Sequence, residues 1–153
     1  AMPLADAKKV IAYHRCVGAW ATHVVAHAAG LSFTTWLVGP DAAYSLAPLQ
    51  HDEALALLDR IGFAYAHGLR APLAAARKTA FAWIAAERRD ADAANDAARC
   101  YGPRDFGGGG EVVEDAYLAR SFPDFAALHD AGFERWLDLY RPLVERLRRG
   151  DAA

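Results

Sequence analysis

The first part of the chain has the apolar periodicity of an amphipathic helix. Apolar side chains recur there at steps of three and four positions: Val10, Tyr13, Val17, Trp20 or Ala21, Val24 and Ala28. This spacing predicts a helix over residues 5–29. Asp6 lies in its first turn, where a negative charge suits the helix dipole, and Gly30 follows as a C-terminal stop.

The pattern changes after Gly30 from a helical to an extended one. Residues 31–38 are rich in β-branched and aromatic side chains, and residues 43–47 resume an extended pattern that stops at Pro48. Gly39-Pro40-Asp41 between them is a strong turn signal. The sequence therefore predicts an antiparallel hairpin over about residues 31–49. Because an isolated hairpin is marginally stable, we expect it to pack on a helix or to form the edge of a sheet whose other strands lie outside this chain.

Helical patterns account for most of the remaining chain. We predict helices over residues 52–69, 79–101, 112–131 and 133–149, with Pro123 dividing the third of these into two short helices. Asp52 and Thr79 are candidate N-caps. The polar residues 87–99 favour a solvated surface helix. The prediction is a mainly α fold with a small β-hairpin (α+β), forming a single domain over residues 3–150.

Composition fits this fold and excludes several classes of function. The 153 residues are enough for one domain with its own core. A formal net charge of −2 argues against a strongly basic nucleic-acid-binding module. No stretch approaches the roughly 18–20 consecutive apolar residues of a bilayer-spanning helix, so we expect no membrane contact. Cys16 and Cys100 form no CxxC pair, and no export signal opens the chain, which favours a cytoplasmic location.

His23 and His27 are candidate metal ligands. Their spacing of four on a predicted helix points two imidazoles in the same direction, as in zinc sites. No glutamate has the position that it takes in an HExxH motif, and no nearby Cys or His completes a ligand set. We therefore interpret both as surface or partly buried structural histidines.

Two further motifs have incomplete chemistry. Gly107–Gly110 could cradle a phosphate, but no Lys-Ser/Thr pair follows and Glu111 would face the phosphate, so a flexible linker is favoured. Asp6-Ala7-Lys8 has the D-x-K spacing of metal-dependent nucleases, which also need an aspartate on a preceding strand. Because the segment has a helical pattern, an active nuclease is the least favoured interpretation.

The basic end of the chain does not define a site either. Arginines at positions 141, 146, 148 and 149 could meet phosphates, but arginines are common at helix C-termini. No GxSxG elbow supports a nucleophilic triad. From the residues alone we assign no catalytic, cofactor-binding or metal-binding residue, and we expect no cofactor.

Several short motifs occur in the order that they have in one protein family. They are Ala19-Trp20-Ala21-Thr22-His23-Val24, Trp36-Leu37-Val38-Gly39, Leu46-Ala47-Pro48-Leu49, Gly68-Leu69-Arg70-Ala71-Pro72-Leu73, Lys78-Thr79-Ala80-Phe81-Ala82-Trp83, the run from Asp115 to Phe125 and Tyr140-Arg141-Pro142-Leu143. No single motif is specific. Their colinear order resembles the extreme C-terminal region of the gamma chain of exodeoxyribonuclease V, the RecC subunit of the RecBCD helicase–nuclease.

The resemblance implies a non-catalytic subunit of a DNA-repair complex. The gamma chain holds the beta and alpha chains (RecB and RecD), splits the duplex and helps to recognise the Chi sequence. Its last domain resembles a nuclease fold that has lost its catalytic residues. For this chain the resemblance implies the helical C-terminal part of a degenerate restriction-endonuclease-like, PD-(D/E)xK-like domain. A whole gamma chain is several-fold longer, so we interpret this chain as a fragment that starts at Met2.

The resulting hypothesis is a non-catalytic fragment that serves subunit assembly and DNA handling in double-strand-break repair by homologous recombination. Its expected partners are RecB, RecD and the rest of the gamma chain, with DNA reached through the complex, whose activity would be that of an ATP-dependent exodeoxyribonuclease V. The alternative is a free-standing helical protein-interaction domain with no role on DNA. A fragment should expose apolar surface meant for a neighbour, so we expect Phe33, Trp36 or nearby residues on an exposed patch or in a homodimer contact.

Overall fold

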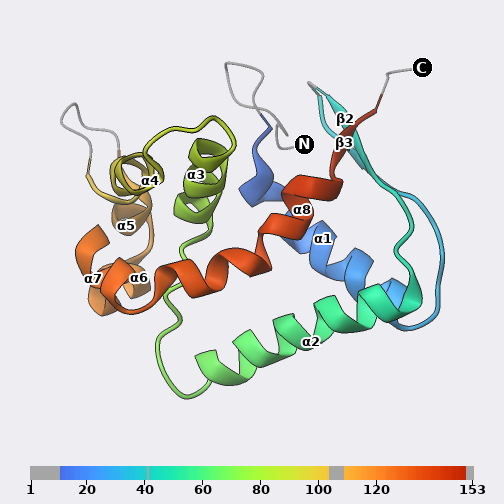
Figure 1. The fold of residues 1–153 in the computed structure, drawn as a ribbon, viewed down its shortest axis with the longest axis horizontal. Coiled ribbons are helices and arrows are strands. Elements are labelled where there is room, and N and C mark those ends of the chain that lie inside the picture. The colour runs from blue at the N-terminus through green and yellow to red at the C-terminus, as the bar shows by residue number, and fades with distance from the viewer. Residues whose placement is uncertain (1–10, 41, 104–108, 151–153) are drawn as a thin grey trace. The chain divides into compact units, whose positions relative to one another are not determined.

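The protein is described by a computed structural model, which covers residues 11–40, 42–103 and 109–150. The chain divides into two compact units. Unit 1 combines residues 1–65 with residues 142–153, and unit 2 consists of residues 66–141. Figure 1 labels most of the helices and strands of both units.

Helix α1 (Tyr13–Ala28) supplies much of the core of unit 1. Its buried face contains two histidines as well as apolar residues: Cys16, Trp20, His23, Val24 and His27. The sequence pattern placed Tyr13, Val17 and Ala28 on the apolar stripe, but these three side chains are only half-buried. Residues 5–10 of the predicted helix lie outside the described residues.

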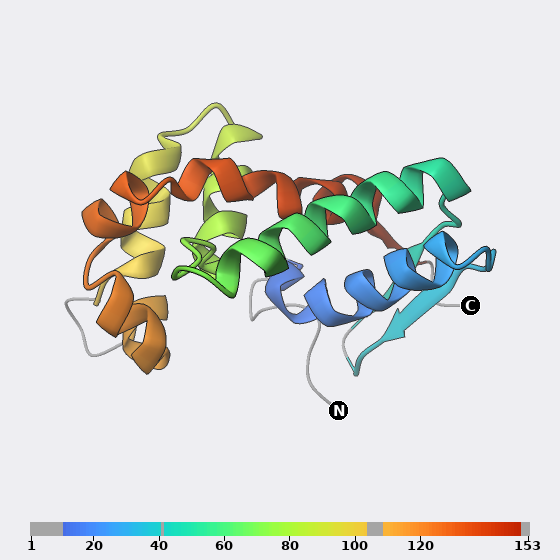
Figure 2. The same ribbon diagram turned by 90° about the horizontal axis from the view of Figure 1, so that it is seen from below.

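The predicted hairpin is confirmed. Strands β1 (Thr35–Val38) and β2 (Ala43–Leu46) pair antiparallel, with Thr35 opposite Leu46 and Val38 opposite Ala43. The inner face of the sheet is apolar and buried, because Leu37, Tyr44 and Leu46 point into the core of unit 1. Strand β1 lies beside α1 (Figure 2), so the hairpin packs on a helix, as an otherwise marginal hairpin must.

The end of the chain adds a third strand that the sequence pattern did not predict. Strand β3 (Arg148–Arg149) pairs antiparallel with β2, with Ser45 opposite Arg148 and Tyr44 opposite Arg149. The strand order is β1-β2-β3. The predicted helix over residues 133–149 is therefore wrong: the segment forms the 3-10 helix η1 (Phe133–Leu139), helix α8 (Arg141–Arg146) and β3. Because Arg148 and Arg149 pair with β2, they are not part of the helix.

Helix α2 (His51–Gly68) confirms the helix predicted over residues 52–69. It begins at His51, so Asp52 lies in its first turn and is not the N-cap. The apolar stripe is only partly covered, since Leu55 and Tyr65 are exposed whereas Leu58 and Ile61 are half-buried.

In unit 2, helices α3 (Arg77–Glu87) and α4 (Ala93–Tyr101) pack against each other. They replace the single helix predicted over residues 79–101. The turn between them contains Asp90 with a φ of 54°, a left-handed conformation that aspartate tolerates better than most residues. The carboxylate of Asp92 then caps α4 by accepting a hydrogen bond from the N–H of Asn95 at 3.0 Å. Most side chains of residues 87–99 are exposed, as the predicted solvated surface requires, and Ala97 is the buried exception among them.

The chain from residue 111 to 131 forms three short helices, where two were predicted over residues 112–131. They are α5 (Glu111–Glu114), α6 (Ala116–Ser121) and α7 (Phe125–Asp130). Asp115 accepts hydrogen bonds from the N–H groups of Tyr117 and Leu118 and so starts α6 as a new helix. Asp124 caps α7 in the same way through the N–H of Ala127. The predicted break at Pro123 is confirmed.

The structure is thus mainly helical, with eight α-helices and a small three-stranded antiparallel sheet in its described part. This confirms the α+β class at the level of element content. The single domain over residues 3–150 stays a prediction. No helix of the described residues is long and apolar enough to cross a membrane.

Candidate functional site

The two histidines considered as metal ligands lie deep in unit 1. His23 and His27 are each 1% exposed, and their ring centroids are 4.0 Å apart. His23 Nδ1 is 2.8 Å from the hydroxyl of Thr35 in β1, and its Nε2 is 3.1 Å from the carbonyl oxygen of Ala47 after β2. His27 Nδ1 bonds the carbonyl oxygen of His23 at 2.8 Å, and its Nε2 lies 3.1 Å from that of Phe33. The pair therefore ties α1 to both ends of the hairpin.

These hydrogen bonds use both ring nitrogens of His23. Because a carbonyl oxygen only accepts, Nε2 carries the proton and donates to Ala47, while Nδ1 accepts from the Thr35 hydroxyl. Burial lowers the pKa of His23, and the neighbouring His27 lowers it further, which favours the neutral ring. No three His, Cys, Asp or Glu side chains in the described ranges are grouped to hold a metal ion. Both histidines are buried and hydrogen-bonded, where the sequence pattern suggested surface or partly buried positions.

Several apolar side chains are exposed in β1 and in the segment just before it. Leu31, Phe33, Trp36 and Val38 have exposed fractions between 43% and 77%, and we call these four residues the β1 apolar strip. One side of Phe33 contacts the His27 ring, with 5.0 Å between centroids. Phe33 and Trp36 are both exposed, as expected.

The side chain of Trp36 lies across the outer face of the sheet. A Cβ added to Gly150, directly after β3, would be 2.6 Å from Cζ3 of Trp36, so the indole reaches from β1 over β2. The β2 residues on its path are small, since Ser45 is opposite Trp36 and Ala43 is the next residue on that face. The indole therefore covers the middle of the sheet and leaves the outer edge of β1 uncovered by this side chain.

A buried carboxylate organises unit 2. Glu111 in α5 is 6% exposed and accepts hydrogen bonds from the N–H of Lys78 at 3.0 Å, and from the N–H and hydroxyl of Thr79 at 2.8 and 2.9 Å. Helix α3 has no side-chain cap of its own at Ala76, so Glu111 satisfies its first-turn donors and faces the positive end of its dipole. The predicted N-cap role of Thr79 is therefore wrong. Thr79 lies inside the first turn of α3 and donates hydrogen bonds to the carboxylate of Glu111, which caps the helix.

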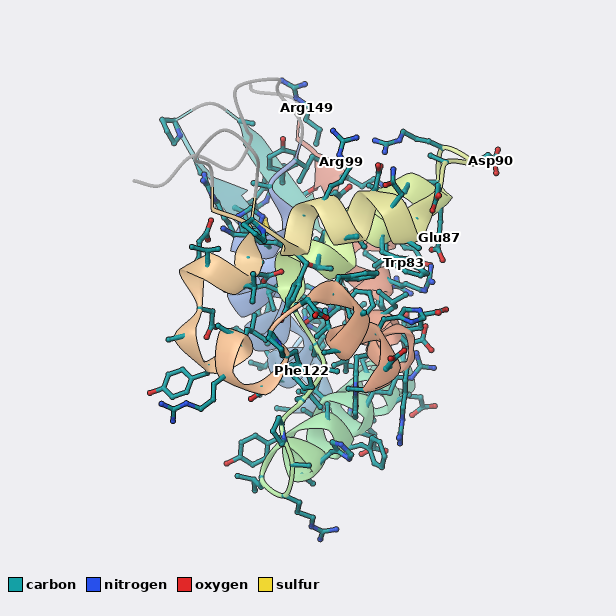
Figure 3. All side chains as sticks on the ribbon, turned by 90° about the vertical axis from the view of Figure 1, so that its left-hand side faces the viewer. Trp83, Glu87, Asp90, Arg99, Phe122 and Arg149 are labelled. Carbon is teal, nitrogen blue, oxygen red and sulfur yellow. The ribbon has the colours of Figure 1, made fainter. Side chains whose placement is uncertain are left out.

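A second polar cluster fixes the other end of α3. Glu87 accepts two hydrogen bonds from the guanidinium of Arg141, at 2.6 and 3.0 Å, and one from the indole N–H of Trp83 at 2.9 Å. Figure 3 shows Trp83 and Glu87 next to each other on α3. The bonds from Arg141 lower the pKa of Glu87 most; partial burial opposes them, and the bond from Trp83 adds to the lowering. Arg141 is thus engaged by a carboxylate, as Arg146 is by Glu53 in unit 1.

The end of the glycine run has a packing role. A Cβ on Gly110 would lie 1.7 Å from the carbonyl oxygen of Gly102 and 2.4 Å from that of Tyr101, so only glycine allows this close approach. Beside it, Tyr101 donates to the carbonyl oxygen of Phe122 at 2.6 Å, and burial together with the charge of Glu111 raises its pKa to about 12. Gly107, Gly108 and the predicted nuclease-like pair Asp6 and Lys8 lie outside the described residues.

In the described residues, buried polar groups thus hold the helices and the hairpin in place, and the β1 apolar strip is exposed. Comparison with protein families matches residues 5–88, 84 of the 153 residues, to the RecC C-terminal domain. Because the match covers more than half of the sequence, the chain belongs to the RecC C-terminal domain family. A comparison with curated proteins finds no match.

The family match confirms the resemblance, and it covers residues 5–88. Residues 5–88 include α1, the hairpin, α2 and α3, and therefore the buried His23, the exposed Trp36 and the Thr79 that binds Glu111. The motifs from Asp115 to Phe125 and from Tyr140 to Leu143 lie beyond the matched residues. Sequence reasoning missed Glu111 and the Glu87–Arg141 pair, since each acts on a residue more than thirty positions away.

Proposed function

We propose that this chain is a non-catalytic C-terminal domain of the exodeoxyribonuclease V gamma subunit that serves subunit assembly. In this proposal its partners are the beta and alpha chains (RecB and RecD) and the rest of the gamma chain. It reaches DNA through that complex, in the cytoplasm, during double-strand-break repair by homologous recombination. The observation that carries the proposal is membership of the RecC C-terminal domain family.

The surface of unit 1 supports an assembly role. The β1 apolar strip adds two aromatic and two aliphatic side chains to one surface segment, and Val38 alone is 77% exposed. Burying such side chains lowers the free energy by about 25 cal/mol per Å² of apolar surface, so a partner could bind there through apolar contacts and without ion pairs. We propose that the β1 apolar strip is where unit 1 meets another part of the complex.

The absence of a catalytic role is part of the proposal. We infer that the helices correspond to the helical part of a degenerate PD-(D/E)xK-like domain, which would position partners without cutting DNA. Incubation of the purified chain with linear DNA and Mg²⁺ should give no cleavage. Cleavage that Asp6→Ala abolishes would contradict the proposal, because Asp6-Ala7-Lys8 is the D-x-K pair that metal-dependent nucleases use.

Co-purification tests the assembly role directly. The chain is co-expressed with the beta and alpha chains of the same genome, with and without the rest of the gamma chain, and recovery of each subunit is measured. Leu31→Asp should lower this recovery, because it puts a charge into the proposed contact. Tyr117→Asp, at an 83% exposed position of α6 in unit 2, is the matched control and should leave recovery unchanged.

Two results would overturn the assembly proposal. One is the absence of the other subunits from the purified chain under every co-expression condition, which would favour a free-standing interaction domain. The other is equal recovery with Leu31→Asp and with the unchanged chain, which would move the contact away from the β1 apolar strip.

A further inference from the structure

Helix α2 carries a line of apolar positions that is largely exposed. Leu55, Leu58, Gly62 and Tyr65 follow one another at steps of three, four and three positions, which places them on one face of the helix. Leu55 and Tyr65 are 40% and 69% exposed, and Leu58 is half-buried. We call these four residues the α2 seam. Their spacing is that of the a and d positions through which one helix packs against another.

The middle of the α2 seam is open. The residues that α2 buries completely are the small Ala54 and Ala64, so its larger apolar side chains are left for the outer face. A Cβ added to Gly62 would have no atom of the described residues within 4 Å beyond the backbone of its own helix. Because glycine lets another backbone approach closely, a second helix could lie directly against α2 at this position.

One flank of the α2 seam is acidic. Asp52 and Asp59 are seven positions apart, so both occupy the e position beside the seam, and both are exposed. Within the described ranges neither carboxylate forms an ion pair. The g positions on the other flank, Ala54 and Ile61, carry no charge. Because charges at e and g positions determine which helices pair, the α2 seam favours a helix with basic residues opposite Asp52 and Asp59.

We propose that the α2 seam binds an amphipathic helix of another subunit. That helix has apolar residues at alternating steps of three and four, and Lys or Arg seven positions apart along one flank. A second α2 does not fit: an antiparallel pair would place the carboxylates against each other, and a parallel pair would face them with the uncharged g positions. The same carboxylates would be repelled by an anionic lipid surface. The proposal rests on the assembly function and adds a second contact to the β1 apolar strip.

Photo-cross-linking in the complex tests the proposal. Tyr65→p-benzoylphenylalanine keeps an aromatic side chain in the α2 seam and, on irradiation, bonds covalently to whatever lies against it. The chain is titrated into purified RecB, RecD and the rest of the gamma chain, and mass spectrometry identifies the cross-linked peptide. We expect a helical segment of one of these subunits with the apolar and basic pattern given above. Tyr117→p-benzoylphenylalanine, the same replacement at an 83% exposed position of α6 in unit 2, is the matched control and should not give this product.

Two further variants, each combined with the cross-linker at position 65, test the gap and the charge. Gly62→Gln favours the helix but fills the gap with a polar side chain, so the chain concentration for half-maximal cross-linking should rise about tenfold. Gly18→Gln, at an exposed glycine of α1 with the same open space, should leave that concentration unchanged. Asp59→Lys should raise it about threefold, because it replaces an attraction by a repulsion, whereas Asp130→Lys at an exposed position of α7 should not.

Several results would overturn the proposal. They are a cross-link from position 65 to a second copy of this chain or to a segment without the basic residues, no cross-link at all, and equal effects of a variant and its control. Co-purification of RecB and RecD with the same chain separates the two possible failures. If both subunits are recovered without a cross-link, only the contact at the α2 seam is refuted, whereas their absence refutes the assembly function as well.

Discussion

At the scale of single residues, buried polar groups determine how this domain holds together. His23 makes two hydrogen bonds and Glu111 accepts three, all with groups distant in sequence. In the described part of the chain no buried side-chain nitrogen or oxygen lacks a hydrogen-bond partner. A buried group without a partner costs about 1–3 kcal/mol, so each of these contacts is expensive to break although each contributes modestly when made.

Glu111→Gln should destabilise the chain by about 1–3 kcal/mol. The amide oxygen can replace one carboxylate oxygen, but the NH₂ group then faces donors of Lys78 or Thr79 and leaves at least one of them unpaired. The charge at the start of α3 is lost as well. The free energy of unfolding from urea titrations followed by circular dichroism measures the loss.

Glu114→Gln is the control for this residue. Glu114 lies in the same helix α5 as Glu111 and forms an exposed ion pair with Lys78 of α3, so its neutralisation should cost less than about 1 kcal/mol. Equal losses for the two variants would show that Glu111 contributes as a surface charge and not as a buried cap.

At the scale of elements, the joint between α1 and the hairpin depends on a neutral histidine. His23 has a pKa below its ordinary value of 6.5, because it is buried and lies beside His27; its hydrogen bond to Ala47 opposes this shift, and Arg146 adds to it. The unfolded chain therefore binds a proton at a higher pH than the folded chain. Stability is complete above the unfolded pKa, and it falls as the pH drops from about 6.5 toward the folded pKa.

Acidification from about pH 7 to pH 5.5 should weaken the fold of unit 1, with a slope of at most about 1.4 kcal/mol per pH unit from His23. His23→Gln keeps a donor for Ala47 but does not titrate, so its stability should fall less over this range. Urea titrations at several pH values give the two slopes, and the carboxylates contribute equally to both. Parallel slopes would refute the role of His23.

The elements that the sequence predicted well are those with a strong local signal. The hairpin has β-branched residues around Gly39-Pro40, and α2 has a long apolar period, so both lie within a few residues of their predicted bounds. The break between α3 and α4 was missed because neither glycine nor proline occurs there; Asp90 and the cap Asp92 make it instead. Strand β3 has no residue that favours β-structure, and its pairing with β2 joins residues about a hundred positions apart, which no local pattern can show.

The candidate surface was predictable only in part. Exposure of Phe33 and Trp36 was expected because a fragment should expose apolar surface meant for a neighbour, and both side chains are exposed. The burial of His23 and His27 did not follow, because the spacing of four alone does not show whether the two imidazoles face the core; the sequence favoured surface or partly buried positions. Their partners, Thr35, Ala47 and Phe33, become visible only when the hairpin is packed on α1.

At the scale of the whole molecule, unit 1 is discontinuous in sequence. The chain leaves it at Tyr65, forms all of unit 2 and returns at Pro142. The returning segment supplies the buried Leu147, which is 3% exposed, and strand β3, which pairs with β2. Directly after β3, the N–H of Gly150 donates a further hydrogen bond to the carbonyl oxygen of Ala43 at 2.9 Å. The hairpin therefore depends on residues that are synthesised about a hundred positions later.

A chain that ends at Arg146 should lose the stability of unit 1 selectively. The truncation removes the buried Leu147 side chain, whose burial contributes at least about 1.5 kcal/mol, and β2 loses its pairing with β3 as well. Hydrogen exchange should therefore accelerate at the amides of β1 and β2, while those of α3 and α4 stay protected, because their packing and the Glu111 cap lie within unit 2. A chain that ends at Gly150 keeps Leu147 and β3, so it should exchange like the full chain. Equal acceleration in both units would show that they unfold as one cooperative body and that the returning segment stabilises the whole molecule rather than the hairpin.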